Sequence, residues 1–188
     1  SGLITYTYDA NNNVKTETRQ RTVNGTLVDE TVSYDYDKLN RLIKTTYPDT
    51  SYSEIVYDLA GNVDKERGRF GTWTDFEYDG YGRLIQTDYA DGTFEKREYS
   101  AEGLLKNVTD VSGKLTSYEY DDAGRQWKVT YPDSSFTETR YTPQGWVKSE
   151  TDARGNLTEY QYDKAGKRKK VLRHIDGAIH THEFDYYK

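Results

Sequence analysis

The 188-residue chain contains 32 acidic and 26 basic side chains, and its formal net charge of -6 gives no electrostatic reason to expect a nucleic-acid partner. Only 34% of the residues are apolar and the mean hydropathy is -1.04, but 19 Tyr, 5 Phe and 3 Trp are too many aromatic residues for a disordered chain. The absence of cysteine excludes disulfides and leaves the cellular compartment open, and no apolar run has the length of a membrane span.

The first two residues differ in character from the rest of the chain. The sequence opens with Ser1-Gly2 and contains no methionine, which is typical of an excised fragment with a vector remnant. We therefore expect residues 1–2 to be that remnant and residues 3–188 to form one repeat region of about eight repeats.

A tyrosine recurs at every twenty-first position, and the seven positions are Tyr36, Tyr57, Tyr78, Tyr99, Tyr120, Tyr141 and Tyr162. The first Tyr-Asp pair, Tyr8-Asp9, lies twenty-eight positions before Tyr36, so this interval carries seven extra residues. At the other end, Phe184-Asp185 lies twenty-two positions after Tyr162. A fixed period of this kind predicts a repeat architecture.

Each repeat tyrosine begins a predicted turn. An aspartate usually follows it, with Ser100 and Thr142 as substitutes, and a glycine lies four residues after it, with Asn40 as the exception. The aspartate can accept a hydrogen bond from the backbone N–H two residues on, and glycine or asparagine tolerates the positive φ of a tight turn. The predicted structural turn residues are Asp37, Asp58, Gly61, Asp79, Gly82, Gly103, Asp121, Gly124, Gly145, Asp163 and Gly166.

A second turn lies between successive Tyr-Asp turns. It is marked by breaker sequences at Tyr47-Pro48-Asp49, Asp91-Gly92, Ser112-Gly113, Tyr131-Pro132-Asp133, Arg154-Gly155 and Asp176-Gly177. The intervening segments are rich in Thr, Val, Ile and Tyr and have room for about six residues per strand. The predicted fold is all-β, with a repeated 21-residue antiparallel hairpin in one long sheet that curves or spirals.

Alternate hairpins differ, which adds a second period twice as long, a 42-residue double unit. After the turn, one class carries apolar residues at alternate positions, as in Ile85-Thr87-Tyr89 and Trp127-Val129-Tyr131. The other class carries polar residues in the same places, as in Lys148-Glu150-Asp152. Either the apolar hairpins meet a second layer or a partner, or the period is an inherited duplication that never diverged.

Two further columns bear on packing. Equivalent tyrosines lie two strands apart, about 9.6 Å, so we expect Leu42, Val63, Leu84 and Leu105 on the intervening strands to fill the space between the rings. A third column is apolar in every repeat, at Tyr52, Trp73, Phe94, Leu115, Phe136 and Leu157. It lies five residues before the repeat tyrosine, so either both faces of the sheet carry apolar groups or a bulge shifts the phase.

The sequence Tyr-Asp-x-x-Gly-Arg-Leu at Tyr78 to Leu84, repeated in variant form at Tyr36 to Leu42 and at Tyr120 to Arg125, resembles the YD repeat of Rhs-type proteins. The resemblance extends from Tyr8 to the end of the chain. It implies a segment of a large secreted or cell-surface polypeptide whose hairpins wind into a spiralling β-sheet shell. Bacterial Rhs and toxin-complex members enclose a C-terminal toxin, and the animal teneurins use a related shell for adhesion. The Asp-Pro-x-Gly-Leu cleavage signature of the family has no match here, so toxin release and toxicity are not transferred to this fragment.

Candidate chemistry is sparse. His174, His180 and His182 with Asp176 suggest a metal site, but a two-residue turn at Asp176-Gly177 places His174 on the opposite face from the other two. The turn aspartates already have a structural role, and we see no nucleophile triad and no phosphate-binding loop. We therefore predict no catalytic residue, no metal and no cofactor.

Carbohydrate binding is the main alternative to a structural role. Trp146 follows the turn residue at a position where the other repeats carry Arg41, Asn62, Arg83, Leu104, Arg125 and Lys167. We therefore expect it to be exposed and name it as the candidate glycan contact, with a surface aromatic residue that binds nothing as the alternative. Trp73 and Trp127 fall in apolar columns and are interpreted as packing residues.

The basic run Lys167-Arg168-Lys169-Lys170 with Arg173 could bind an acidic group, but it also discourages edge pairing of a terminal strand. The expected function is a non-catalytic wall segment of a shell that encloses or presents another polypeptide, such as a toxin domain. The expected partners are neighbouring repeats and an attached domain, with glycans or self-association through end strands as alternatives.

Overall fold

The computed structural model describes residues 3–175 and 177–184, and these residues form 17 β-strands and no helix. All 17 strands are members of one antiparallel sheet, which confirms the all-β class and the repeated hairpins. No helix in the described part of the chain is long and apolar enough to cross a membrane. The expected remnant Ser1-Gly2, the turn residue Asp176 and the terminal Asp185 lie outside the described residues.

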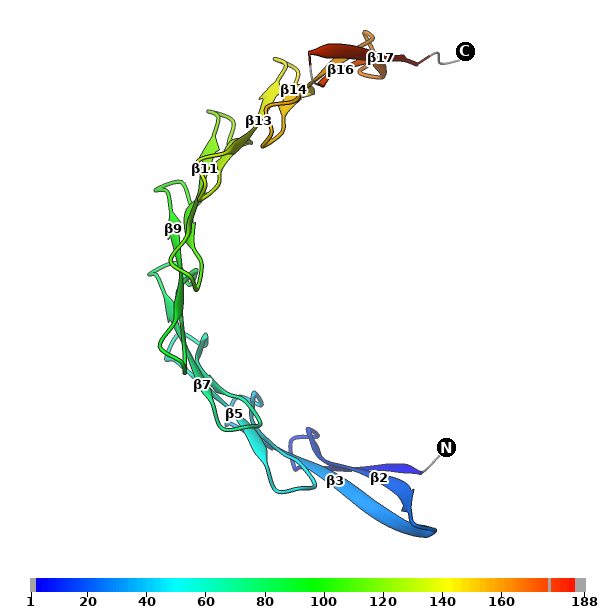
Figure 1. Cartoon of the computed structure of the whole chain (residues 1–188). Coiled ribbons are helices and arrows are strands. Elements are labelled where there is room, and N and C mark those ends of the chain that lie inside the picture. Colours follow the sequence, from blue (N-terminus) through cyan, green and yellow to red (C-terminus); the bar gives the residue numbers. More distant parts are fainter. Residues whose placement is uncertain (1–2, 176, 185–188) are drawn as a thin grey trace. The chain divides into compact units, whose positions relative to one another are not determined.

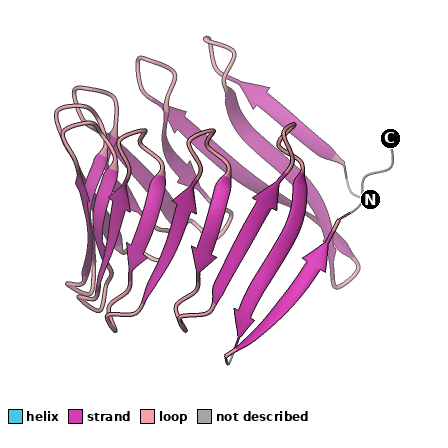
Figure 2. Cartoon of the chain, turned by 90° about the horizontal axis from the view of Figure 1, so that it is seen from above, coloured by secondary structure: helices cyan, strands magenta, loops and turns pink. Residues whose placement is uncertain are grey.

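The chain divides into two compact units, residues 1–94 and 95–188. The first unit contains β1 (Ile4–Tyr8), β2 (Val14–Val23), β3 (Thr26–Tyr36), β4 (Leu42–Thr46), β5 (Tyr52–Tyr57), β6 (Val63–Arg67), β7 (Trp73–Tyr78) and β8 (Leu84–Tyr89). The second unit contains β9 (Phe94–Tyr99), β10 (Leu105–Thr109), β11 (Leu115–Tyr120), β12 (Gln126–Thr130), β13 (Phe136–Tyr141), β14 (Val147–Thr151), β15 (Leu157–Tyr162), β16 (Arg168–Ile175) and β17 (Ala178–Glu183). Strand β9 begins at Phe94, which is the last residue of the first unit. Within each unit the strands pair in chain order and the sheet bends progressively (Figure 1). Turns close the strands at both ends (Figure 2).

A β-bulge follows every Tyr-Asp turn. In the β7–β8 hairpin Tyr78 pairs with Leu84 and Glu77 with Gln86, so Ile85 is the extra residue. The same shift recurs in the hairpins of both units, at Lys15, Ile43, Asp64, Ile85, Lys106, Trp127, Lys148 and Lys169. A bulge at a fixed place in each hairpin adds twist to each, and this favours a sheet that bends.

Apolar groups lie on both faces of the sheet. The strand that leads to the repeat tyrosine pairs residue by residue on both sides, as β5 does with β4, so Tyr52 and Tyr57 point to opposite faces. The bulge is on the following strand and does not move the third column to the face of the repeat tyrosines, here called the tyrosine face. On the opposite face cations cover the column, since Arg67 Cζ lies 3.9 Å and Lys44 Nζ 4.3 Å from the Tyr52 ring centre.

Burial is shallow because no second layer covers either face in the described structure. The buried residues among those described are Thr87, Val129, Ser149 and Val171. Thr87 and Val129 belong to the apolar class of hairpin, whereas Glu66 and Glu150 at equivalent positions are exposed. Burial within each unit therefore follows the 42-residue alternation.

The seven extra residues of the first interval lengthen one hairpin. Strands β2 and β3 have 10 and 11 residues, against five or six in the other strands of the first unit. Their tip is a two-residue turn in which Asn24 and Gly25 both have positive φ, 49° and 81°, the geometry that suits a twisted hairpin. The β2–β3 hairpin extends beyond the turn that joins β4 to β5 (Figure 1).

Candidate functional site

The Tyr-Asp turn is closed by the aspartate and the residue four positions later. In the turn at Asp79 the carboxylate accepts hydrogen bonds from the Tyr81 and Arg83 backbone N–H groups, at 2.9 and 3.1 Å. Arg83 Nε and Nη2 lie 2.7 and 2.6 Å from Oδ2, so both nitrogens pair with the same carboxylate oxygen. The hydrogen bond from the Arg83 side chain is the main cause of the lowered pKa of Asp79. The hydrogen bonds from the backbone N–H groups lower this pKa further. Gly82, at φ 75°, donates to the Asp79 carbonyl at 2.9 Å.

The other predicted turn residues lie in equivalent turns. Arginine pairs with the aspartate at Asp37 and Asp121, whereas Asn62 Nδ2 donates to Asp58 at 3.0 Å. The exceptional Asn40 has φ 61° and replaces the glycine in its turn. Asparagine is among the residues that adopt this conformation most readily.

The substituted turns keep their backbone closure. Ser100 Oγ accepts from the Leu104 N–H at 3.3 Å and Thr142 Oγ1 from the Trp146 N–H at 3.2 Å, longer contacts than those of the aspartates. The backbone bonds of the same turns, from Ser100 N to Leu104 O and from Thr142 N to Trp146 O, are short at 2.8 and 2.7 Å. The substitution therefore lengthens the side-chain contact and leaves the backbone of the turn closed.

Trp146 is half-buried, and the expectation that it is exposed is wrong. Its ring centre lies 5.2 Å from that of Tyr162, the next repeat tyrosine. A Cβ atom at Gly166 would lie 2.6 Å from Trp146 Cζ2, so the indole sits directly on the glycine of the next turn. The stacking explains the burial, because a ring at this position reaches the following hairpin.

Arginine occupies the same place in other repeats. Arg41 Cζ lies 4.0 Å from the Tyr57 ring centre, and Arg125 Cζ lies 4.3 Å from that of Tyr141. Both arginines also lie close to the next turn: a Cβ atom at Gly61 would lie 3.5 Å from Arg41 Nη1, and one at Gly145 would lie 3.4 Å from Arg125 Nη1. Trp146 is therefore the aromatic version of an arginine that joins one Tyr-Asp turn to the next.

The hydroxyls of the repeat tyrosines tie consecutive hairpins together. Tyr57 Oη donates to the Leu42 carbonyl at 3.1 Å, and Tyr162 Oη donates to the Val147 carbonyl at 2.7 Å. Leu42 also pairs with Tyr36, so its backbone contacts two consecutive repeat tyrosines. Tyr36 and Tyr141 make equivalent bonds to Val14 and Gln126.

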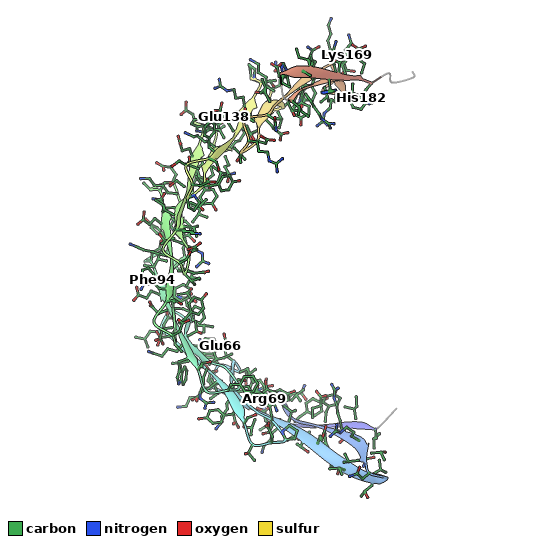
Figure 3. The ribbon with its side chains drawn as sticks, viewed as in Figure 1. Glu66, Arg69, Phe94, Glu138, Lys169 and His182 are labelled. Carbon is green, nitrogen blue, oxygen red and sulfur yellow. The ribbon has the colours of Figure 1, made fainter. Side chains whose placement is uncertain are left out.

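The histidines and the basic run lie in the last hairpin. Arg173 pairs with His180 and Ile175 with Ala178, as the two-residue turn predicts, so His174 is on the other face from His180. His174 Nε2 is 3.0 Å from Glu159 Oε2, and no group of three metal-ligating side chains occurs among the described residues. In the basic run, Lys170 Nζ forms an ion pair with Glu183 at 2.8 Å. Figure 3 labels Lys169 of the same run and His182 of β17, which locate this hairpin.

A groove of about 670 Å³ lies on the tyrosine face of the first unit, beside the long β2–β3 hairpin. Tyr34 and Tyr47 contribute rings, and Glu17, Arg19 and Arg69 contribute charges. Arg69, which is labelled in Figure 3, lies over the Tyr47 ring at 4.1 Å and pairs with Asp49 at 2.8 Å. Sequence reasoning missed this groove; the longer first interval, from Tyr8 to Tyr36, was the signal that could have located it.

Comparisons with known proteins agree with this description. Residues 99–135 and 141–178 match the family model described as RHS Repeat, and a search of curated proteins gives no match. The crystal structure of TcdB2-TccC3-TEV has a TM-score of 0.64 and 14% identity, over 94% of this chain and 11% of that one. The Tc holotoxin pore of Photorhabdus luminescens has a TM-score of 0.57 and 17% identity, over 96% of this chain and 12% of that one.

This chain therefore spans 11 to 12% of the length of those chains, and at such identities the likeness shows the fold. The family model rests on the sequence and matches two adjacent segments of the second unit. The resemblance to Rhs repeats is thus confirmed at residues 99–135 and 141–178, which match the family model.

Proposed function

We propose that this chain is a non-catalytic structural segment in the wall of a shell that encloses or presents another polypeptide, such as a toxin domain. The observation that carries the proposal is the set of side-chain contacts that join consecutive hairpins. The hydroxyls of Tyr57, Tyr141 and Tyr162 each donate to a backbone carbonyl 15 residues earlier, and Arg41, Arg125 or Trp146 lies over the same three rings. Each hairpin is thus held by its neighbours, which is how a repeat protein without a thick core is stabilised.

The charged side chains that looked most like a site already have partners in the turns. Asp37, Asp79 and Asp121 each form an ion pair with the arginine four residues later, and each accepts backbone hydrogen bonds. Carboxylates held in this way serve the fold and are not presented to a substrate. The fold likeness to the toxin-complex structures supports a wall segment and, with it, an attached domain as partner.

The parent protein is proposed to act outside the producing cell, as the Rhs resemblance implies. Glycan binding through Trp146 has no supporting contact, because its ring packs on Tyr162 and Gly166. A glycan array probed with the chain and with Trp146→Ala tests this point. Saturable binding that the substitution abolishes would contradict a purely structural role.

The structural role itself is tested in the full-length parent polypeptide by limited proteolysis. The attached domain should resist digestion in the native protein, and Gly166→Ala should increase its digestion because it disrupts the contact with Trp146. Gly124→Ala is the matched control, since a Cβ there meets nothing within 4 Å. If the attached domain is digested equally fast in the native protein and after unfolding, the shell proposal fails.

A further inference from the structure

One edge of the first unit is left open by unequal hairpin lengths. Strand β3 pairs with β2 from Thr26 to Ser33, but its pairing with β4 covers only Ser33 to Tyr36. The chain leaves β4 at Thr46 and turns at Pro48, so no described strand continues beside the first half of β3. The groove on the tyrosine face reaches this point, since Glu30 and Val32 of β3 and Pro48 after β4 are among its lining residues.

The open edge carries unpaired backbone groups in a defined pattern. The backbone N–H of Gln20 donates to the Leu3 carbonyl, so it points away from β3. Backbone groups alternate in direction along a strand, so the N–H groups of Arg19 and Arg21 point towards β3. Arg19 pairs with Glu30 and Arg21 with Val28, so the backbone of these partners points back to β2. By alternation, the N–H and C=O groups of Leu27, Asp29 and Thr31 point to the open edge.

The side chains at this edge also suit a further strand. Leu27 and Val28 are 65% and 42% exposed although they lie in a strand, so each face of the edge has an apolar contact to offer. The charges of the groove are paired, with Arg19 Nε 2.6 Å from Glu17 and Arg69 2.8 Å from Asp49. Asp29, in contrast, is exposed beside the open edge and offers a carboxylate to a basic side chain.

The geometry points to an extended polypeptide strand as the ligand of this edge: it would pair with the backbone of residues 27–31 and place one side chain in the groove beside Tyr34 and Tyr47. Strand addition of this kind draws its affinity from main-chain hydrogen bonds and its specificity from pockets for alternate side chains. Alternating β-branched residues suit the edge, and a lysine or arginine suits the position opposite Asp29. This site is independent of the shell proposal, because an isolated segment with no shell function would still present it.

The experiment measures binding of the fluorescein-labelled peptides Thr-Val-Lys-Val-Thr-Val and Thr-Val-Thr-Val-Thr-Val, the second without a basic residue, and of hexapeptides selected from a random display library on the folded chain. Asp29→Pro removes an outward N–H and leaves the β2–β3 ladder intact, so we expect binding about tenfold weaker. Asp29→Ala is the matched control, which keeps the N–H and should change binding by less than about twofold for peptides without a basic residue. Far-UV circular dichroism checks that both variants fold.

A second measurement needs no substitution. Bound peptide should slow hydrogen exchange at the amides of Leu27, Asp29 and Thr31 and leave those of Val28 and Glu30, already bonded to β2, unchanged. Failure to select any hexapeptide overturns the proposal, as does equal binding to the Asp29→Pro variant. Uniform protection of all five amides would contradict backbone pairing. Binding of an oligosaccharide pool that is lost equally in Asp29→Ala and Asp29→Pro would also contradict it, because it would show recognition by side chains.

Discussion

The contact between Trp146 and the next turn gives a quantitative prediction. Gly166 and Gly124 both have positive φ, 80° and 74°, so a side chain at either position costs about 1–2 kcal/mol in backbone strain. At Gly124 a Cβ meets nothing within 4 Å, whereas at Gly166 it would lie 2.6 Å from Trp146 Cζ2. The indole must move, and overpacking of this kind adds about 1–3 kcal/mol. We therefore expect Gly124→Ala to lower the free energy of unfolding by about 1–2 kcal/mol and Gly166→Ala by about 2–5 kcal/mol.

Urea unfolding followed by far-UV circular dichroism measures both costs. The double variant Trp146→Ala/Gly166→Ala isolates the contact, because the added methyl then has room and the cost of Gly166→Ala should fall to that of Gly124→Ala. Equal losses in the two single variants would refute the packing of Trp146 on the next turn. The same result would remove the ground for treating Trp146 as a structural residue.

Three further outcomes are expected. Trp127→Asp should lower the free energy of unfolding by about 3 kcal/mol more than Lys148→Asp. Both residues occupy the bulge position, but Trp127 is half-buried and Lys148 is exposed. Equal losses in chemical denaturation would show that the two hairpin classes do not differ in burial. Thr50 has φ 67°, so Thr50→Asn should raise the free energy of unfolding by about 1 kcal/mol; an unchanged or lower melting temperature would contradict strain at this turn. The pKa of Asp79 is lowered in the folded state, so the stabilising effect of the carboxylate is complete above its ordinary pKa of 3.8 and is lost as the pH falls through the folded value. Asp79→Asn should therefore reduce the fall in melting temperature with decreasing pH below about pH 4. A fall as steep as that of the native protein would argue against the pair with Arg83.

The periodicity of the chain was enough to predict its local structure. The regular spacing of the tyrosines, with aspartate next and glycine four residues on, placed the turns, and the alternation of hairpin classes matched the burial of Thr87 and Val129. Turn chemistry is local and reads directly from residue type. The two-residue turn before Ala178 likewise predicted the pairing of Arg173 with His180.

Contacts between repeats were harder to predict. Trp146 looked exposed because the equivalent positions of the other repeats carry mostly charged or polar residues, yet two of these residues, Arg41 and Arg125, lie over the next repeat tyrosine. The phase of the third column was open for a similar reason: a bulge leaves no mark in composition, and Ile43, Asp64 and Lys106 share its position with unrelated chemistry.

The sequence by itself determined the turns, the strand period and the resemblance to Rhs repeats, because each depends on residues within about one repeat of one another. Only the tertiary structure decided which face each column takes, that Trp146 packs on Gly166, and that the seven extra residues of the first interval leave one edge of the first half of β3 unpaired. These features depend on the relative lengths and registers of adjacent hairpins. A register is a property of two strands together, and neither strand's sequence states it alone.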